Sequence, residues 1–298
     1  MRIEKLGKEI NNRSILQDIT LTIKKGEITG LIGQNGSGKT TFFRSIAGHY
    51  EPDEGQIFIE KQDIKKHVHL KQQLFYIDEQ YNFLAGYSLH KLQQFYQCAY
   101  QNFDSKKYSI LLKKHKLHAK MNYHSLSKGM QGLYKMILAV CSNAEYLLLD
   151  EPFDGLDVIV KKKVIRMLLD DVSEQKRAII ISSHNLTELE SLIDRALILK
   201  DNQIQYDYHL EQLREKARKL QMVFKTKKVP QVVKKNSRPL HYQGRVITAI
   251  FENYTDEIER MILAERPLLF EEVPLTLEDV FEVHVTKEEQ HSLRGGVL

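Results

Sequence analysis

The segment 33–40, with the sequence GQNGSGKT, constrains the fold of this chain more than any other feature. It matches the phosphate-binding pattern G-x-x-x-x-G-K-[ST] at every fixed position. The apolar residues at 28–32 predict a strand before it, and 41–47 predict the start of a helix after it. A glycine-rich loop between a strand and a helix points backbone N–H groups at phosphate oxygens, and the helix N-terminus adds partial positive charge. The sequence therefore predicts a nucleotide-binding site.

Individual residues of this loop have distinct expected roles. Lys39 is predicted to reach the β- and γ-phosphates, and the Thr40 hydroxyl is predicted to bind Mg²⁺. A chance match in a glycine-rich turn is the alternative, and the flanking strand and helix argue against it. The residues predicted to contact ATP are Gly33, Gln34, Asn35, Gly36, Ser37, Gly38, Lys39, Thr40 and Thr41.

Two acidic residues follow a second apolar run, YLLL at 146–149, which predicts a buried parallel strand. The carboxyl ends of such strands meet at the sheet edge that faces the phosphates. Asp150 is therefore predicted to hold Mg²⁺, directly or through water, and Glu151 to polarise an attacking water. Either carboxylate alone could instead cap a strand end. A third apolar run, at 178–181, leads into His184, which can contact a γ-phosphate but taken alone would more simply be a hydrogen-bonded core residue.

Size and composition limit the remaining function classes. The chain of 298 residues can hold one large domain, or a core of about 200 residues with an appendix. It has no apolar run of about 18 residues and no signal-peptide core, so we expect a cytosolic protein, or one held at a membrane by something else. Cys98 and Cys141 lack metal-type spacing and are expected to be reduced thiols. The net charge of +5, with lysines spread along the chain, is weak support for binding nucleic acid or anionic lipid.

Outside these motifs, the hydrophobic pattern predicts strands near the N-terminus and helices in the middle of the chain. Residues 1–25 alternate as strands, with a hairpin turn at 11–12. Residues 81–134 have a helical pattern and are expected to form an inserted helical region. One face of its first helix is expected to comprise Leu89, Leu92, Phe95 and Tyr96. Further expected elements are strands at 55–64, 196–199 and 203–206, and helices at 158–172 and 188–194.

After a charged helix at 210–220, the character of the sequence changes. A basic connector at 225–238, around short strands, leads into a compact α+β appendix of roughly 70 residues, near the lower limit for a stable core. The appendix has no catalytic constellation. Thr276 and Asp279 are spaced as a capping box that opens its last helix. Its other expected elements are strands at 246–251 and 268–272 and a helix at 255–264.

Together these motifs resemble those of the ATP-binding subunits of ABC transporters, over about the first 220 residues. The segment 126–130, LSKGM, lies upstream of Asp150 and is similar to the LSGGQ signature of that family. Residues 155–157 resemble its D-loop, and His184 resembles its switch histidine. Each motif alone is weak, but five of them in family order are a specific match. The resemblance implies an α/β P-loop NTPase fold, with an ABC cassette at 1–220 that has a RecA-like core, an antiparallel β subdomain and a helical subdomain at about 81–134, and a small α+β accessory domain at 222–298.

The resemblance also implies how the motifs work. In this family two cassettes close head to tail, and each ATP with its Mg²⁺ lies between the phosphate loop of one cassette and the signature of the other. Ser127 and Gly129 would then contact the γ-phosphate bound at Lys39 of a second cassette, and Asp157 would link the two sites. A single set of motifs implies one half of a dimer, with an identical or a paralogous second cassette. Closure needs ATP and hydrolysis relieves it, which gives a two-state element.

Several positions depart from the family pattern. Ile10 stands where the family usually stacks an aromatic residue on adenine, and an aliphatic contact gives up about 1 kcal/mol of stacking. Glu79 aligns with the Q-loop glutamine that joins the Mg²⁺ site to the membrane partner, and Gln80 is adjacent to it. Glu79 is therefore expected to contact both nucleotide and metal. Lys128 replaces a signature glycine and Met130 replaces the signature glutamine.

These departures resemble one branch of the family. Similar Ser-Lys-Gly-Met signatures occur in bacterial exporter subunits that move antibiotics or amphipathic peptides. The overall pattern resembles the ATPase subunits of a phenol-soluble modulin exporter. The C-terminal sequence LEDVF at 277–281 also resembles that branch. The resemblance implies an ATPase that docks on a separately encoded transmembrane permease and drives the export of a peptide, toxin or drug. Its expected place is the cytoplasm, peripheral at the inner face of the cell membrane, with membrane contact only through the partner and no nucleic acid.

Two alternatives keep the ABC fold. Non-transport members act in translation or in chromosome repair, but the translation type generally carries two cassettes in one chain. The repair type needs a long coiled coil between the first motif and the signature, and the segment 40–126 contains no sustained heptads. The other alternative is a cassette that binds ATP with little turnover. The intact set of Asp150, Glu151 and His184 argues against it.

Overall fold

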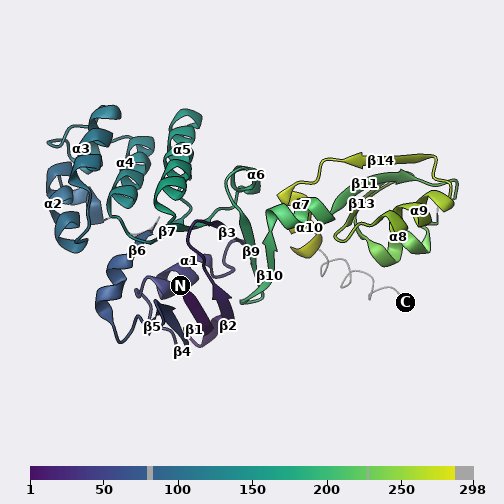
Figure 1. The fold of residues 1–298 in the computed structure, drawn as a ribbon, viewed down its shortest axis with the longest axis horizontal. Helices are drawn as coiled ribbons and strands as arrows, with labels where there is room; N and C mark the ends of the chain where they lie inside the picture. The colour runs from purple at the N-terminus through teal and green to yellow at the C-terminus, as the bar shows by residue number, and fades with distance from the viewer. Residues whose placement is uncertain (79–82, 227, 286–298) are drawn as a thin grey trace. The chain divides into compact units, whose positions relative to one another are not determined.

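The computed structural model describes residues 1–78, 83–226 and 228–285 (Figure 1). Contacts divide the chain into two compact units. The first, here the cassette unit, comprises Met1–His184 and Leu192–Asp207. The second, the accessory unit, comprises Asn185–Ser191 and the described residues from Tyr208 onward. The expected domain boundary at 220–222 falls inside a strand of the accessory unit, because the residues on both sides of it are buried in that unit's own core.

The cassette unit is built on a six-stranded sheet with the strand order β10-β9-β3-β8-β7-β6. Strands β3, β6, β7, β8 and β9 are parallel to one another, and both faces of the sheet are covered, which explains their near-continuous apolar sequences. The register pairs Asp150 with Ser182 at the carboxyl ends of two neighbouring strands. The strands are β3 (Ile28–Ile32), β6 (Leu74–Ile77), β7 (Tyr146–Asp150), β8 (Ala178–Ser182), β9 (Arg195–Lys200) and β10 (Gln203–His209).

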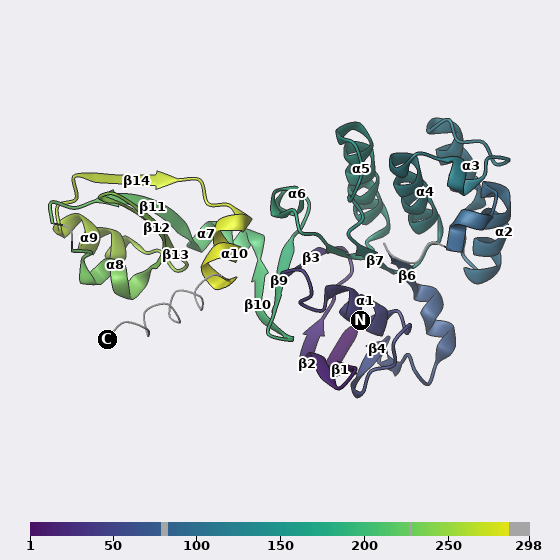
Figure 2. The ribbon, with the colours of Figure 1, turned by 180° about the vertical axis from the view of Figure 1, so that it is seen from behind.

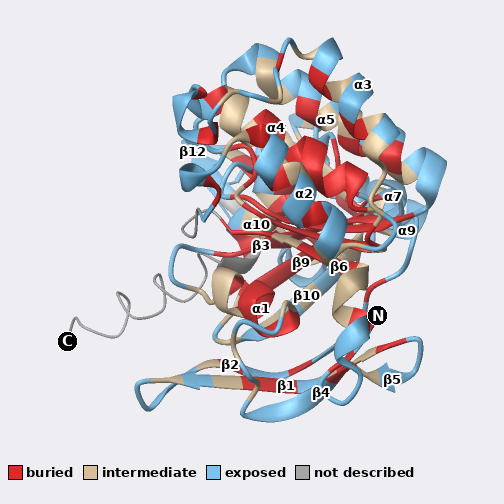
Figure 3. Ribbon diagram, turned by 90° about the vertical axis from the view of Figure 1, so that its left-hand side faces the viewer, coloured by how far each residue is buried: buried red, intermediate tan, exposed pale blue. Residues whose placement is uncertain are grey.

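A second, antiparallel sheet completes the cassette core, in the order β2-β1-β4-β5. Asn11 and Asn12 both have positive φ, of 52° and 60°, which suits the primed turn of a tight hairpin and confirms the expected turn. Helix α1 (Lys39–Ile46) packs between the two sheets and is largely buried (Figure 3). Its Phe42 and Phe43 are fully buried. The other elements are β1 (Arg2–Ile10), β2 (Arg13–Thr22), β4 (Glu54–Ile59), β5 (Gln62–Asp63) and the 3-10 helix η1 (Val68–Gln73).

Helices cover the other face of the six-stranded sheet (Figures 1 and 2). Most of them begin at a side-chain cap, which explains their starting points. Of the helix face expected at the start of α2, Leu89 and Tyr96 are buried but Phe95 is 52% exposed, because it lies beside the buried stripe. The elements are η2 (Phe83–Gly86), α2 (Leu89–Ala99), α3 (Ser105–Lys114), η3 (Tyr123–Ser125), α4 (Lys128–Cys141) and α5 (Val158–Gln175).

The accessory unit contains a four-stranded antiparallel sheet in the order β12-β13-β11-β14. Its chain order of strand, helix, two strands, helix and strand is that of the split βαβ, or ferredoxin-like, motif. The core lies on the face covered by α8 and α9 and includes Leu220, Met222 and Phe251. The elements are β11 (Arg218–Val223), α8 (Gln231–Asn236), β12 (Arg238–Gln243), β13 (Val246–Phe251), α9 (Asp256–Ala264), β14 (Leu269–Val273) and α10 (Leu277–Val285).

Several accessory elements differ from the sequence expectations. The charged helix expected at 210–220 ends earlier, as α7 (Leu210–Lys216), and the connector at 225–238 contains the helix α8. The helix expected at 188–194 is α6 (Leu186–Glu190). The capping box is confirmed, because Thr276 N–H donates to Asp279 Oδ2 at 2.8 Å and Asp279 N–H donates to Thr276 Oγ1 at 3.2 Å.

Within the described ranges, we find no helix with the length and apolar character needed to cross a bilayer.

Candidate active site

The loop 33–38 joins β3 to α1 and has the backbone shape that phosphate binding requires. Gly36 and Gly38 have φ of 81° and 106°, in the left-handed region that glycine tolerates best. A Cβ at Gly38 would lie only 3.1 Å from the backbone oxygen of Ile15, so the loop also needs glycine for close packing. Gly38 caps α1 without a side-chain hydrogen bond. The loop's backbone donors and the positive end of α1 can therefore be directed at an anion.

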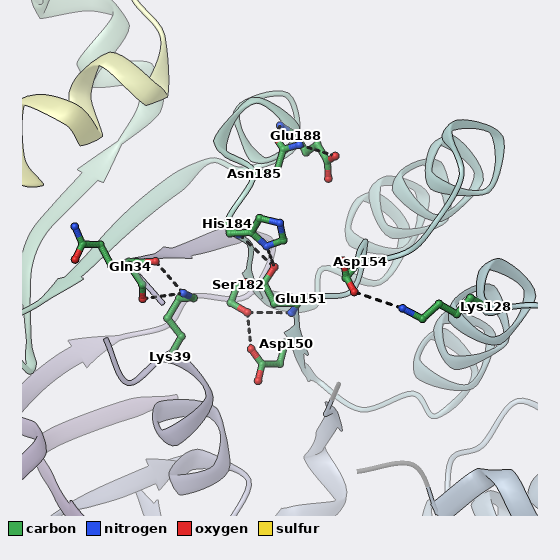
Figure 4. Close-up of polar contacts among 11 residues, drawn as sticks. Gln34, Lys39, Lys128, Asp150, Glu151, Asp154, Ser182, His184, Asn185 and Glu188 are labelled. Carbon is green, nitrogen blue, oxygen red and sulfur yellow. Dashed lines mark hydrogen bonds and ion pairs between the residues drawn. The ribbon is translucent and has the colours of Figure 1, made fainter. Parts of the chain in front are cut away.

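Lys39 lies folded over this loop. Its Nζ donates to the backbone oxygens of Gly33 at 2.8 Å and Gln34 at 3.3 Å (Figure 4). Burial lowers the pKa of the Lys39 ammonium, and the nearby carboxylates of Glu151 and Asp150 oppose this shift. The side chain thus spans the loop on the side where the two carboxylates end β7.

The chemistry of the loop suits a phosphate group. The Ser37 hydroxyl is buried and finds no hydrogen-bond partner among the described residues. A buried hydroxyl without a partner costs about 1–3 kcal/mol, which a phosphate oxygen would offset by accepting its hydrogen bond. With Lys39 and the start of α1, Ser37 makes the loop a good fit for a nucleotide phosphate.

Three residues at the ends of β7 and β8 form one hydrogen-bonded group. Ser182 Oγ donates to Asp150 Oδ1 at 2.6 Å and accepts from the Glu151 N–H at 3.0 Å (Figure 4). Ser182 is completely buried, so its hydroxyl is shielded from exchange with water. The sequence analysis overlooked Ser182. The signal for it was the register of the two strands. Strand β7 ends at Asp150, and β8 ends beside it at Ser182, two residues before His184.

Glu151 and His184 meet beside this group. His184 Nδ1 lies 2.9 Å from Glu151 Oε2, and the His184 backbone N–H donates to the same oxygen at 3.2 Å. Glu151 has a φ of 46°, a strained conformation that costs a non-glycine residue about 1–3 kcal/mol. The His184 side chain is 62% exposed and that of Glu151 15%, so the pair faces outward from the sheet edge. This arrangement can orient a water molecule and accept its proton.

The signature residues lie on the helical side of the cassette unit. Ser127 caps α4 by accepting from the Met130 N–H at 3.3 Å. A Cβ at Gly129 would lie 3.4 Å from Asp157 Oδ2, so these two residues are neighbours. Asp157 caps α5 by accepting from the N–H groups of residues 159 and 160, both at 2.9 Å. Within the described residues, Ser127 makes no hydrogen bond with the phosphate loop.

Two nucleotide contacts were expected outside the main motifs, at Ile10 and at Glu79. Ile10 is half-buried at the end of β1, where it pairs with the residue after the hairpin turn. Ile15, not Ile10, lies against the phosphate loop. Its carbonyl oxygen and side chain are so close to Gly38 that they would touch a Cβ at that position. Glu79 and the adjacent Gln80 lie outside the described residues.

Asp78 connects the phosphate-loop helix to the end of β6. Arg44 of α1 donates to Asp78 from Nε at 2.9 Å and from Nη2 at 3.2 Å, and both residues are buried. The hydrogen bond to Asp78 raises the pKa of the Arg44 guanidinium despite its burial. The pair fixes one turn of α1 relative to the central sheet, and the sequence analysis did not single it out.

Solvent reaches the carboxylates through an open cavity of about 190 Å³. Its walls include Asp150, Glu151, Lys128 and Asp154, and the last two form a loose ion pair at 3.9 Å. Within residues 1–78, 83–226 and 228–285, no three histidine, cysteine or acidic side chains are arranged so that they could together hold a metal ion. A divalent cation here would thus take few protein ligands. That suits Mg²⁺, which usually binds one or two side chains together with phosphate oxygens and water.

Known proteins share both the sequence and the fold. A family model described as "ABC transporter" matches residues 16–154. The "ABC transporter ATP-binding protein YtrB" of Bacillus subtilis (strain 168) is 33% identical over 282 residues, which cover 94% of this chain and 96% of that protein. The "ABC transporter ATP-binding protein NatA" of the same organism is 30% identical, over 72% of this chain and 90% of its own length.

Solved structures agree on the fold. A structure of an ATP-binding subunit of an ABC transporter superposes with a TM-score of 0.66 and 24% identity, over 72% of this chain and 91% of that one. A dimeric ATP-binding cassette in a post-hydrolysis state, bound to ADP and Pi, superposes with a TM-score of 0.62 and 21% identity, over 70% and 98%. With the family model and the relatives, these matches establish both the α/β cassette fold and the family. The chain belongs to the ABC transporter family as one of its ATP-binding subunits, which are ATP-hydrolysing transport ATPases.

Proposed function

We propose that this chain is the motor subunit of an exporter. In this proposal two cassettes close head to tail around ATP and Mg²⁺, and hydrolysis drives a peptide, toxin or drug through a separately encoded transmembrane subunit. The observation that carries the proposal is the group formed by Asp150, Glu151, Ser182 and His184, which lies at one sheet edge beside Lys39.

The phosphate loop and α1 bind the nucleotide. Backbone N–H groups of 33–41 and the Ser37 hydroxyl donate to the phosphate oxygens, and Lys39 turns from the loop carbonyls toward the β- and γ-oxygens. Mg²⁺, when bound, neutralises charge on those oxygens, and Thr40 and Asp150 would hold it. Ser182 keeps Asp150 oriented, because the hydroxyl donates to the carboxylate oxygen Oδ1.

Glu151 is assigned to the chemical step. Its carboxylate orients the attacking water and accepts the water proton, while one of its oxygens stays fixed by His184. The Ser182 hydroxyl holds the Glu151 peptide in its strained conformation. His184, which remains largely exposed, is then available to contact the γ-phosphate.

The proposal needs a second cassette to complete each site. Ser127, Gly129 and Asp157 form a separate group on the helical side, which suits contact with a nucleotide held by another copy or by a paralogue. The relative solved as a dimer bound to ADP and Pi supports this assembly. Gly129 presents backbone rather than a side chain at the helix start, where the positive end of α4 can face the γ-phosphate.

Export and membrane attachment rest on two further features. The LSKGM signature and the similarity to YtrB over nearly the whole chain, accessory unit included, support a transport subunit of this form. Phe83 and Phe95 have ring centroids 5.4 Å apart and remain 55% and 52% exposed in the helical region. An exposed aromatic pair is an apolar anchor of the kind found at protein interfaces. We assign it to the transmembrane subunit, which would hold the chain at the inner face of the cell membrane.

Complementation tests the composite site. Chains with Lys39→Ala cannot bind the phosphates, and chains with Ser127→Arg cannot complete a neighbour's site, so each alone should hydrolyse almost no ATP. Mixing them in equal amounts should restore about a quarter of the wild-type rate, because half of the dimers are mixed and each mixed dimer has one intact site. Where the second cassette is a paralogue, the substitutions are divided between the two proteins.

The matched control replaces the Ser127→Arg chain by one that carries both substitutions. This mixture contains the same lesions but no intact site, and should show no recovery. Equal activity in the two mixtures, or hydrolysis by a diluted monomer at the full rate, would contradict the head-to-tail assignment.

A further inference from the structure

The helical region carries an uneven share of the charge. Residues 105–144 contain eight lysines and no arginine, aspartate or glutamate. These residues carry a charge of +8, whereas the whole chain has a net charge of +5. The remainder of the chain therefore has a net charge of −3. The lysines are therefore less evenly spread than the sequence analysis assumed.

Five of these lysines form an exposed surface. Lys107 pairs with Asp171 at 3.1 Å, Lys128 pairs loosely with Asp154, and Lys135 lines the active-site cavity. The others are exposed, and across the described ranges none of them has an acidic side chain within 4.0 Å. They are here called the lysine surface: Lys106, Lys113, Lys114, Lys116 and Lys120.

The positions of these lysines give the surface a definite shape. Residues 106, 110, 113 and 114 are spaced to lie on one face of α3, whose opposite face holds the buried Tyr108 and Leu112. Ile110 lies between the lysines of that face and is 58% exposed. Lys113 and Lys116 also line an open hollow of about 490 Å³ beside α2, which His118 borders. The hollow is large enough to admit a phosphate headgroup.

The local field is positive beyond the lysine surface itself. The pKa of His115, at the end of α3, is lowered by burial and further by Lys114 and by Lys163 of α5. Lys163 is also exposed, so α5 adds positive charge next to α3. An anion at this surface therefore meets several cations.

We propose that the lysine surface binds the anionic headgroups of a phospholipid membrane directly, independently of any transmembrane subunit. Lysine ammonium groups on flexible stems suit a diffuse anionic surface, whereas specific phosphate or nucleic-acid sites favour the planar guanidinium of arginine, which this segment lacks. The exposed Ile110 adds an apolar contact among the cations, as at membrane interfaces. Aromatic side chains nearby, such as Tyr108 and Tyr123, are fully buried and offer no platform for stacking bases.

Vesicle co-sedimentation of the full chain tests this proposal. The protein should bind vesicles of phosphatidylcholine with about 30 mol % phosphatidylglycerol, and it should not bind vesicles of pure phosphatidylcholine. Salt at about 0.5 M should release the bound protein, because it screens the charges. Each lysine removed should weaken binding about fivefold. The combined substitutions Lys106→Gln, Lys113→Gln, Lys114→Gln and Lys116→Gln should therefore abolish it.

A matched control removes the same charge elsewhere. Lys24→Gln, Lys66→Gln, Lys234→Gln and Lys235→Gln alter four exposed lysines outside the lysine surface and the active site, and should leave most of the binding intact. Both variants should keep the wild-type thermal unfolding temperature, which excludes a folding defect. Ile110→Ser should weaken vesicle binding a few-fold without changing the charge.

Three results would overturn the proposal. They are no binding of the wild type to anionic vesicles, equal loss in both four-lysine variants, and tighter binding to a single-stranded oligonucleotide than to the vesicles at the same salt. None of these results would contradict the assignment of ATPase activity, which the complementation of Lys39 and Ser127 variants tests separately.

Discussion

Replacing Ser182 with alanine should slow ATP hydrolysis much more than it weakens ATP binding. The hydroxyl makes two buried contacts, one to the charged Asp150 at 2.6 Å and one from the Glu151 N–H at 3.0 Å. A hydrogen bond to a charged group is worth about 1.5–3 kcal/mol, and the substitution also leaves a buried donor without its acceptor. The phosphate loop itself is untouched, so the loss should appear where Glu151 acts.

The size of the effect follows from these contacts. If about 1.4–2.7 kcal/mol of the lost interaction is expressed in the barrier, kcat should fall about 10- to 100-fold. The ATP dissociation constant should change by less than about threefold, and the free energy of unfolding should fall by about 1–3 kcal/mol. Steady-state ATPase rates, titration with a fluorescent ATP analogue and urea unfolding measure the three quantities.

Two neighbouring variants serve as controls. Ser182→Thr keeps a hydroxyl at the same position and should retain most of the activity. Ser183→Ala removes the adjacent buried hydroxyl but leaves both Ser182 contacts in place. Wild-type turnover in Ser182→Ala, or the same loss in Ser183→Ala, would refute the positioning role.

Three further outcomes are expected. Asp78→Ala should lower the free energy of unfolding by about 3–5 kcal/mol in urea titrations, because it leaves the buried Arg44 without its carboxylate; a loss below about 1 kcal/mol would contradict this. Iodoacetamide should label native protein at the exposed Cys98 and spare Cys141, since burial raises the pKa of the Cys141 thiol to about 12; peptide mass spectrometry showing equal labelling would count against the packing. Gly38→Ala should abolish ATP binding in equilibrium titrations, because the added Cβ is strained and crowds the loop; unchanged affinity would argue against the loop geometry.

The sequence predicted the phosphate loop and the buried strands because their signals are local. Glycine spacing requires one backbone shape, and apolar runs such as 146–149 and 178–181 occur where both sheet faces are covered. The hairpin turn and the capping box were predicted for the same reason, since each depends on residues only a few positions apart.

Features that depend on distant pairing were missed. The role of Ser182 depends on the register between β7 and β8, which no local pattern contains. The helix expected at 210–220 extended over the first three residues of β11, because Leu220 and Met222 alternate over too few residues to outweigh the charged helix before them. Phe95 was expected on one helix face with Leu89, Leu92 and Tyr96, but tertiary packing buries only the other three.

The account depends most on Glu151 as the residue that activates water. Glu151→Gln preserves the size of the side chain and the hydrogen bond to the backbone of His184, but removes the proton acceptor. ATP affinity should persist while turnover falls about 100-fold or more, the range for losing general-base help.

The most direct measurement combines single-turnover hydrolysis with sedimentation of Glu151→Gln in ATP and Mg²⁺. The account predicts an ATP-bound dimer that persists while the wild type returns to its nucleotide-free association state. The control Glu174→Gln, an exposed carboxylate on α5, should behave as wild type. Hydrolysis by Glu151→Gln at the wild-type rate would contradict the account.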